Sequence, residues 1–541
     1  MKNLFFFLTL VCAFVLCVKA NAKTLVPAHI TVTALPVLGS ANISSGAVFL
    51  AFRCTNHTNQ VLPLEIVVKH GSYRNPEEHR FKRTLRLPGL STCVAAFSIP
   101  RSRKYGHIAW QAHSHSDVVI KKDGESLYSR GDTYKGIASP SFHPELFEYL
   151  FDDIREAPLP VKEWSADSLA YANPALIVLD SKDEIPLPVQ QALHLAAARG
   201  GQILVLVTGD APWPSYAGVE VPGIPFEEKI GFGSRVVMRL TAVDNNPEWK
   251  KFVSRKHAEK AKGKWRDEYK KIRWKEKALY HYLKGVPAPA GAVPPALAMP
   301  PVPLGMLTFI MCCFVVIIGP VNFLVLKKYR AEAWSLVTIP VLSLLFTGAV
   351  IAGVFIKEGF SSKGKGIVES VLDQRTGVIA ARGGFSLYSP LSVGKFHFNS
   401  DDVLNFVNSG KIRGEIDNFW TFSPTLLRPR MTFEYSVARS GYCSEKLVFS
   451  EKNGTLEVVN GLGVRLDTLY VCDGSGKFFK LGAPLEAGAK ATLYAIPKLP
   501  RLAGDIKPHH YRAEVSHPFY IGPGMTPDQY EHKQTIFGRW R

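Results

Sequence analysis

The sequence predicts a multi-domain membrane protein with an N-terminal β-sandwich, an α/β domain with a parallel sheet, a two-helix transmembrane hairpin and a β-rich C-terminal domain. Three observations predict this order. Two apolar stretches, 304–326 and 333–356, are each long enough to cross a bilayer. Short runs typical of β-strands dominate both ends of the chain, and a strand, helix, strand pattern lies between them.

The first 22 residues have the pattern of a signal peptide. Lys2 precedes an apolar run over 4–18, and the small residues at 20–22 match a signal peptidase site. We therefore expect cleavage after Ala22 and export of the remaining chain.

Residues 23–136 are predicted to form a β-sandwich. Runs such as 47–52, 64–69 and 94–99 have strand character, and Asn, Gly and Pro separate them. Several short strands divided by turn residues are typical of this fold.

The pattern changes over 139–245. An apolar run at 175–179 is followed by a helical pattern at 188–198, by Gly200-Gly201 and by a second apolar run at 203–207. Strand, helix, glycine turn and strand in this order predict a parallel βαβ unit and hence an α/β domain.

Two segments connect this domain to the membrane. Residues 248–285 form a basic amphipathic pattern, and 250–284 contains fourteen Lys and Arg against four acidic residues. This stretch could contact anionic lipid headgroups or pack its apolar stripe on its own domain, and both alternatives stay open. Residues 286–303 are rich in Pro and Ala and predict an extended spacer.

The short turn at 327–332 sets the predicted topology. Lys327, Lys328 and Arg330 lie between the two apolar stretches. Since Lys and Arg favour the cytoplasmic side, we place this turn inside and both flanking regions outside a bacterial inner membrane.

Residues 366–541 return to β patterning. Asn453-Gly454 and Asp473-Gly474 lie between strand-like runs and predict two β-hairpins. The last part of the chain is therefore predicted to be β-rich.

The net charge of +19 and the 46% hydrophobic composition bound the class of protein. The apolar content allows several packed cores. A basic chain often binds nucleic acid, but the predicted export excludes that partner, so the expected contacts are the lipid bilayer and another envelope or membrane protein.

Four cysteines lie outside the signal and membrane segments: Cys54, Cys93, Cys443 and Cys472. An oxidising exterior would permit one disulfide in each end region, Cys54 with Cys93 and Cys443 with Cys472. Buried free thiols are the alternative.

Sequence signals for catalysis are absent. No cysteine lies between Cys93 and Cys312, which excludes a thiolate nucleophile in the α/β domain. The chain has no Gly-x-Ser-x-Gly elbow and no phosphate-binding loop of the Gly-x4-Gly-Lys-Ser/Thr type. We therefore assign no catalytic residue and no cofactor.

Asp180 and Asp210 are the candidate ligand-binding residues. Each follows a predicted strand of the parallel sheet, at the edge where α/β proteins bind ligands. A polar turn with no ligand explains both residues equally well.

His113, His115 and Asp117 are the candidate metal ligands. Alternate positions of a strand place them on one face. The spacing is similar to the His-x-His-x-Asp-His signature of metallo-β-lactamase-like hydrolases, but Val118 replaces the final histidine. A polar strand face is the simpler explanation.

The chain resembles bacterial envelope membrane proteins that carry a glutamine-amidotransferase-like, flavodoxin-like α/β domain lacking the catalytic cysteine. The residues that carry the resemblance are Tyr171, 175–179, Leu187-Pro188, Ala192-Leu193, 200–205 and 319–323. The resemblance implies binding or assembly and transfers no catalytic residue.

Together these patterns predict a membrane-anchored, outward-facing scaffold or binding protein of the cell envelope that is not an enzyme. One alternative is an envelope hydrolase acting on glycans or peptides through its carboxylates or a metal near His113. Another is an accessory subunit of a membrane transporter, since the two apolar stretches contain no charged residue that could form a substrate path.

Overall fold

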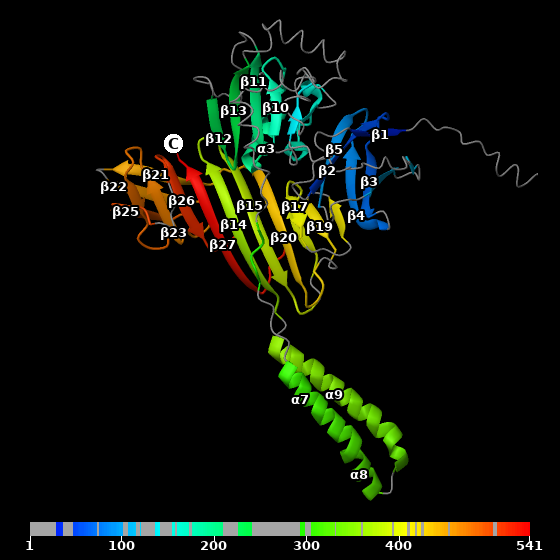
Figure 1. Cartoon of the computed structure of the whole chain (residues 1–541). Helices are drawn as coiled ribbons and strands as arrows, with labels where there is room; N and C mark the ends of the chain where they lie inside the picture. The colour runs from blue at the N-terminus through cyan, green and yellow to red at the C-terminus, as the bar shows by residue number, and fades with distance from the viewer. Residues whose placement is uncertain are drawn as a thin grey trace, which may run out of the picture.

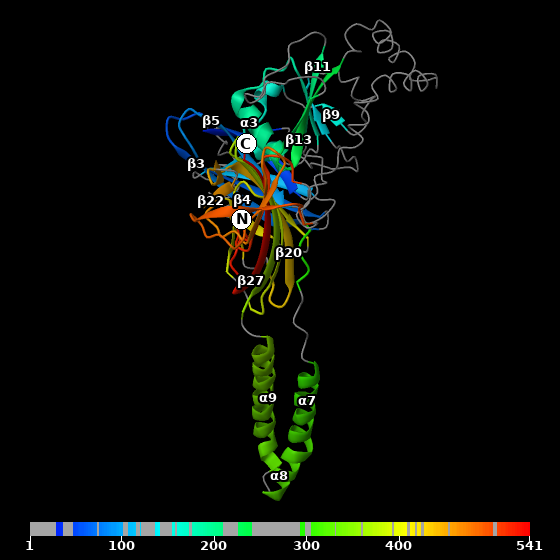
Figure 2. The ribbon, with the colours of Figure 1, turned by 90° about the vertical axis from the view of Figure 1, so that its left-hand side faces the viewer.

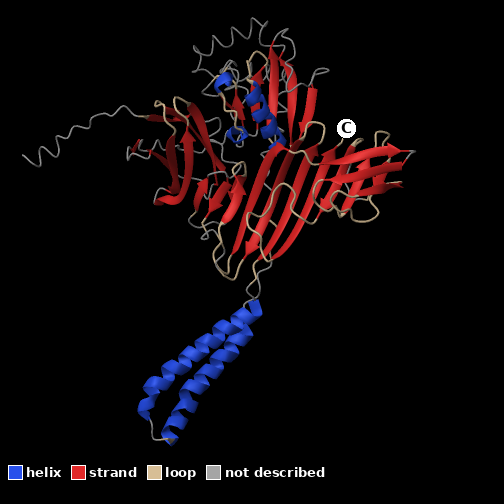
Figure 3. Ribbon diagram, turned by 180° about the vertical axis from the view of Figure 1, so that it is seen from behind, coloured by secondary structure: helices blue, strands red, loops and turns tan. Residues whose placement is uncertain are grey.

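The computed structural model is mostly β-sheet, with a few helices that include two long apolar ones (Figures 1 and 3). The residues it describes are 29–35, 47–72, 75–100, 107–114, 119–120, 136–140, 154–156, 160–171, 176–208, 226–240, 293–297, 304–329, 332–358, 361–391, 394–407, 412–416, 419–423, 427–452, 455–500 and 506–540. The predicted signal peptide and the basic segment 248–285 lie outside these residues, so both remain predictions.

Strands from both ends of the chain form two sheets that share one core. The three-stranded sheet has the order β1 (Ile30–Leu35), β2 (Ala47–Asn56), β5 (Thr92–Pro100). The seven-stranded sheet has the order β16 (Phe396–Asn399), β19 (Phe419–Phe422), β18 (Arg413–Ile416), β4 (Asn75–Leu87), β3 (Leu62–Ser72), β6 (His107–Ser114), β7 (Val119–Ile120).

The junction between β4 and β18 joins the N-terminal region to the C-terminal region. The two strands pair in parallel, with Phe81 opposite Gly414. Phe81 packs on the Trp420 ring at 5.9 Å, and both side chains are fully buried. Residues predicted to belong to separate domains thus bury apolar surface in one core, because a sheet with one apolar face needs a second layer to cover it.

The middle of the chain forms a six-stranded sheet. Its order is β12 (Phe226–Ile230), β13 (Gly233–Leu240), β11 (Gln202–Thr208), β10 (Leu176–Asp180), β8 (Gly136–Ala138), β9 (Ile154–Glu156). All neighbouring strands are parallel except β12, which is antiparallel to β13. The short helices η1 (Val161–Glu163) and η2 (Ser168–Tyr171) precede β10.

Helix α3 (Leu187–Arg199) connects β10 to β11. Pro188 lies in its first turn, where a missing N–H costs no helical hydrogen bond. Gly200 ends the helix at a φ of 132°, a conformation that favours glycine. The helix packs its apolar residues on the six-stranded sheet and on Val378 and Ala380 of the C-terminal region.

The C-terminal region forms an eleven-stranded sheet. Its order is β17 (Val403–Phe406), β20 (Thr432–Tyr442), β15 (Val378–Tyr388), β14 (Lys363–Asp373), β27 (Gln529–Arg539), β26 (His510–Val515), β23 (Thr468–Cys472), β24 (Phe478–Lys480), β25 (Lys490–Ile496), β22 (Thr455–Gly461), β21 (Lys446–Lys452). The pairs β21–β22 and β23–β24 are the two hairpins predicted from Asn-Gly and Asp-Gly.

The apolar helices project from this body and lie side by side (Figures 1 and 2). The first consists of α7 (Leu304–Val316), a π-helical turn (Ile317–Val321) and α8 (Asn322–Lys328), and the second is α9 (Ser335–Glu358) after the short η4 (Glu332–Trp334). Pro320 accounts for the π turn, because it lacks the N–H of a regular helix. Phe314 and Phe346 hold the helices together, with ring centroids 5.4 Å apart.

Two buried asparagines occupy equivalent places in two four-stranded units. Asn56 ends β2, and its Nδ2 donates to the carbonyls of Gln60, Leu87 and Pro88 at 2.7, 3.2 and 3.0 Å. Its Oδ1 accepts the N–H of Thr58 at 2.9 Å. The side chain therefore ties the end of β2 to the turn before β5.

Asn460 does the same in β22. Its Nδ2 donates to the carbonyls of Val464, Leu485 and Glu486 at 2.8, 3.1 and 3.1 Å, and its Oδ1 accepts the N–H of Leu462 at 3.2 Å. The partner positions match those of Asn56, and the strands correspond as β2, β3, β4, β5 to β22, β23, β24, β25. The chain therefore contains the same asparagine-centred turn twice, a repeat that the sequence analysis missed.

Only residues 293–297 of the predicted Pro/Ala spacer lie within the described structure. Residues 293–297 lie against β15, where Pro295 is buried and its carbonyl accepts the Ser386 hydroxyl at 2.5 Å. Gly384 in β15 leaves space for a second backbone, which is the physical reason that the segment docks.

Candidate functional site

The first candidate site is the edge of the six-stranded sheet where its parallel strands end. Asp180 ends β10 and is 5% exposed, and Thr208 ends the neighbouring β11. This is the edge at which parallel sheets bind ligands. Asp210 lies outside the described residues, so the structure does not place it beside Asp180.

The Asp180 carboxylate is engaged in its own turn. Its Oδ1 accepts the N–H of Lys182 at 3.0 Å, and the carboxylate of Asp183 accepts the N–H of Asp180 at 2.9 Å. Burial raises the pKa of Asp180, and the hydrogen bond from Lys182 opposes that rise. These contacts shape the strand end, which is the simpler of the two roles that the sequence left open.

The second candidate site centres on His113 in β6. His113 lies opposite Glu65 of β3 and Val119 of β7. His115 and Asp117 lie outside the described residues. Within the part of the chain that the structure describes, no group of three or more His, Cys, Asp and Glu could hold a metal ion. The predicted metal site stays a prediction.

The structure brings together one of the two cysteine pairs. Cys54 and Cys93 lie directly opposite each other on β2 and β5, and both are free thiols in the structure. Burial, followed by the neighbouring Cys93, raises the pKa of Cys54 to about 12. The other pair is not brought together: Cys443 follows β20, Cys472 ends β23, and the sheet order places β15, β14, β27 and β26 between those strands.

A buried ion pair is the most strongly built polar feature of the C-terminal region. Asp402 is 1% exposed and accepts two hydrogen bonds from Arg439, at 2.7 and 2.8 Å. It also accepts the N–H of Asn399 at 2.8 Å, and Arg439 donates to the Tyr520 carbonyl at 2.8 Å. Burial disfavours the charge of Arg439, but the hydrogen bond and the charge of Asp402 outweigh it and raise its pKa.

Further charged groups, from the N-terminal region, the middle of the chain and the C-terminal region, lie near this pair. We call this set the charge junction: Arg83, Asp167, Arg199, Asp401, Asp402 and Arg439. Arg199, at the end of α3, donates to the hydroxyl of Ser168 at 2.9 Å. The junction contains three guanidinium groups and three carboxylates, so its formal charge is 3 − 3 = 0. A neutral set of this kind has no excess charge with which to attract an ionic ligand.

A second set of charges joins the six-stranded sheet to β14 and β15. Glu228 accepts from Arg235 at 2.5 Å and from Arg375 at 3.5 Å, and Arg235 is 2% exposed. Burial, and then the charge of Arg235, lowers the pKa of His194 on α3. The Arg382 guanidinium lies 4.4 Å from the centroid of the Phe232 ring. These contacts again connect parts of the body.

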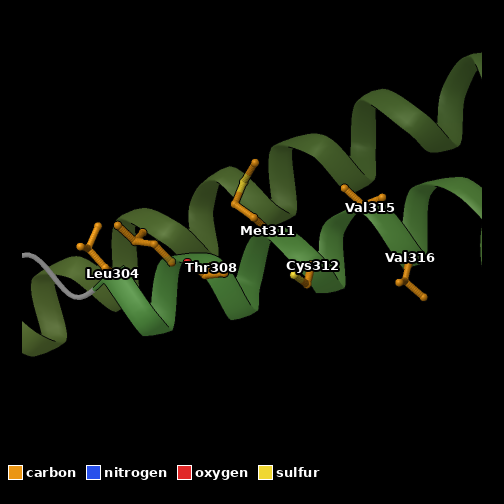
Figure 4. A pocket seen from close by; sticks show the side chains of 7 residues that line it. Leu304, Thr308, Met311, Cys312, Val315 and Val316 are labelled. Atoms are coloured by element: carbon orange, nitrogen blue, oxygen red, sulfur yellow. The ribbon is translucent and has the colours of Figure 1, made fainter.

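The apolar helices offer the remaining candidate surface. The spans Leu304–Lys328 and Ser335–Gly353 have mean hydropathies of 2.7 and 2.1, and within the described structure no part of either is buried. A shallow groove follows one face of α7 and is lined by Leu304, Leu307, Thr308, Met311, Cys312, Val315 and Val316 (Figure 4). The spacing of these residues is that of a single helical stripe.

Comparisons with known proteins give little guidance. The sequence matches no protein-family model and no curated protein. The yeast delta-COP-I mu-homology domain is similar over 33% of this chain and 94% of its own, with 9% identity and a TM-score of 0.19. A Paenibacillus cycloisomaltooligosaccharide glucanotransferase is similar over 32% of this chain and 27% of its own, with 12% identity and a TM-score of 0.17. At such low scores these similarities carry no functional argument.

The sequence analysis missed the residues that the structure singles out. Asp402 and Arg439 are separated by 37 positions and Asp167 and Arg199 by 32, with no motif to connect them. No local signal marked either residue, since Asp402 follows the polar stretch Asn399-Ser400-Asp401 and Arg439 is followed by Ser440 and Gly441.

Proposed function

We propose that the chain is a membrane-anchored, outward-facing scaffold or binding protein of the bacterial cell envelope without catalytic activity of its own. The observation that carries the proposal is the pair of apolar spans that stand free of the body. Lipid tails are the environment that would cover such surfaces on every side.

The proposed topology places the turn at 327–332 in the cytoplasm. Lys327 and Lys328 lie in the last turn of α8, at the end of the helices farthest from the sheets (Figure 2). Positive charge at this end supports an inward turn and outward-facing domains. The signal peptide over 1–22 belongs to the same proposal.

The way the body uses its charges supports a role in binding rather than catalysis. Asp402 pairs with Arg439, and Glu228 pairs with Arg235 and Arg375, so these carboxylates have partners within the chain. The order β10, α3, β11 supports the proposed amidotransferase-like domain, whose family implies assembly when the cysteine is missing.

Crosslinking in native membranes tests the proposal. We expect a protein partner in near-stoichiometric yield after purification and mass spectrometry. The matched control replaces 304–358 by a flexible linker, which should release the body from the membrane and lose the partner. Recovery of the full chain alone, at native expression level, would contradict a scaffold role.

One observation favours the alternative of an envelope hydrolase: Asp180 is buried at the edge where parallel sheets bind ligands. Asp180→Asn would keep the hydrogen bond to Lys182 and remove the charge. If Asp180→Asn folds normally but loses the cellular function that the Asp183→Asn control retains, the result favours the hydrolase over the scaffold.

A further inference from the structure

The segment before the first apolar helix is held on β15 by a specific contact. We call residues 293–297 the strap. The Ser386 hydroxyl, which is fully buried, donates to the Pro295 carbonyl at 2.5 Å. A Cβ atom at Gly384 would lie 2.8 Å from the Cα of Pro294 and would overlap the Val293 carbonyl. Glycine at 384 is therefore a condition for docking.

Both connections to the membrane helices begin on the same pair of strands. From Leu297 to Leu304 the chain has seven residue steps, which reach about 25 Å at most. From Glu358, at the end of α9, to Lys363, at the start of β14, it has five, or about 18 Å. Lys363 pairs with Tyr388 of β15, two residues beyond Ser386.

The opposite end of this strand pair contacts the six-stranded sheet. Arg375, in the turn between β14 and β15, reaches Glu228 of β12 at 3.5 Å. Val378 and Ala380 of β15 lie in the core that contains α3. Each strand has 11 residues, which corresponds to about 36 Å. One continuous pair of strands thus extends from the helix connections to the middle of the body.

We propose that β14 and β15 couple the membrane helices to the six-stranded sheet, and that the strap is the releasable clamp of this coupling. With the strap docked, both ends of the helix pair are fixed to adjacent strands, so the helices hold one direction relative to the body. With the strap released, only the connection to β14 remains, and the helices can tilt. The inference rests on the proposed membrane anchoring.

Single-molecule FRET on the full chain in lipid nanodiscs tests the clamp. Dyes are attached through azide-bearing residues introduced at Ala333, beside the helix turn, and at Lys498, beyond β25, which lies to one side of the helices (Figure 1). We expect one narrow distance distribution for the parent chain and a distribution at least twice as wide for Gly384→Val.

Gly394→Val is the matched control, because a Cβ there meets no atom within 4 Å. It should leave the distribution narrow, and Ser386→Ala, which removes one hydrogen bond, should widen it less than Gly384→Val. Thermal unfolding verifies that each variant is folded. A parent distribution as wide as that of Gly384→Val, or a narrow distribution in a folded Gly384→Val, would overturn the clamp.

Failure of the anchoring itself has a different signature. If the parent chain does not enter nanodiscs and remains soluble without lipid, the proposed function fails. If the parent chain enters nanodiscs and the width of the distance distribution is the same in Gly384→Val, only the clamp fails. The two results are therefore distinguishable in one preparation.

Discussion

The turns around Asn56 and Asn460 have the same hydrogen bonds in different surroundings. Both side chains are buried and tie a strand end to a later turn. The first unit is completed by a distant part of the chain, through β4 and β18, whereas the second lies within the eleven-stranded sheet. The local unit therefore does not determine its neighbours, because the exposed edges of its strands can pair with any suitable strand.

A second difference lies in the backbone of the two turns. Leu90 has a φ of 50° in the first unit, and Gly488, at the equivalent position, has a φ of 76°. A side chain is disfavoured at this conformation, and Leu90 is also 70% exposed. The first turn is thus strained where the second is relaxed.

Asn56→Ala and Asn460→Ala should have the largest effects. Each change leaves buried carbonyls without a donor, and we expect a loss of about 4 kcal/mol in the stability of the affected unit. Hydrogen exchange of β2 and of β22 measures each unit separately. Asn59→Ala, at an exposed position of the first turn, is the control. A loss near that of the control would contradict the shared role of the two asparagines.

A disulfide between Cys54 and Cys93 should have the next largest effect, and it should change the stability of the first unit alone. Oxidation by a disulfide-bearing reagent removes two electrons and two protons from the thiols and forms the bond between the two sulfurs. Closing this loop should stabilise the first unit by roughly 3 kcal/mol and leave the second unchanged. The intact mass after alkylation shows whether the disulfide has formed, and hydrogen exchange of β5 measures the stability of the first unit. An equal effect on β22, or no bond formed under oxidising conditions, would refute this expectation.

Exchanging the turn residues should have a smaller effect. Gly488→Leu forces a side chain into the left-handed region and should cost about 1 kcal/mol. Leu90→Gly removes the same strain, so the first unit should keep or slightly gain stability. Urea unfolding, followed by hydrogen exchange of β5 and β25, shows whether each variant loses or gains stability. If both variants lose stability equally, the two turns are not equivalent.

The smallest expected effect is a loss of stability of the eleven-stranded sheet in mild acid. Burial lowers the pKa of His532 on β27 below the ordinary histidine value, so the folded chain binds this proton less readily than the unfolded chain. Stability is therefore fully present above about pH 6.5 and falls as the pH drops from there toward the folded pKa. His532→Gln should reduce the loss of stability with falling pH, as measured by hydrogen exchange of β27. If the pH dependence is unchanged in this variant, another group causes the loss.

Local patterns predicted much of the fold. Asn453-Gly454 and Asp473-Gly474 predicted two hairpins, and the strands on either side of each dipeptide do pair antiparallel. Apolar length predicted the two helices. The parallel pairing of β4 with β18 was not predictable, since its residues are over three hundred positions apart, as Arg83 and Ile416 are, and pairing through backbone atoms leaves no trace in side-chain type.

The candidate sites were less predictable for a related reason. Ser386 and both asparagines donate to backbone carbonyls, which every residue type has, so no motif identifies their partners. The spacing from Asn56 to Leu87 is 31 and that from Asn460 to Leu485 is 25, which hides the repeat from a search at fixed period. Asp180 was found because strand ends of parallel sheets are recognisable from sequence.

The most direct test of the central claim is extraction of membranes with alkaline carbonate. The full chain should stay in the membrane pellet, because its two spans are long and have mean hydropathies of 2.7 and 2.1. A chain with 304–358 replaced by a flexible linker should move to the soluble fraction and keep its unfolding transition, since no described residue of the spans is buried by the body. Release of the full chain by carbonate would contradict membrane anchoring.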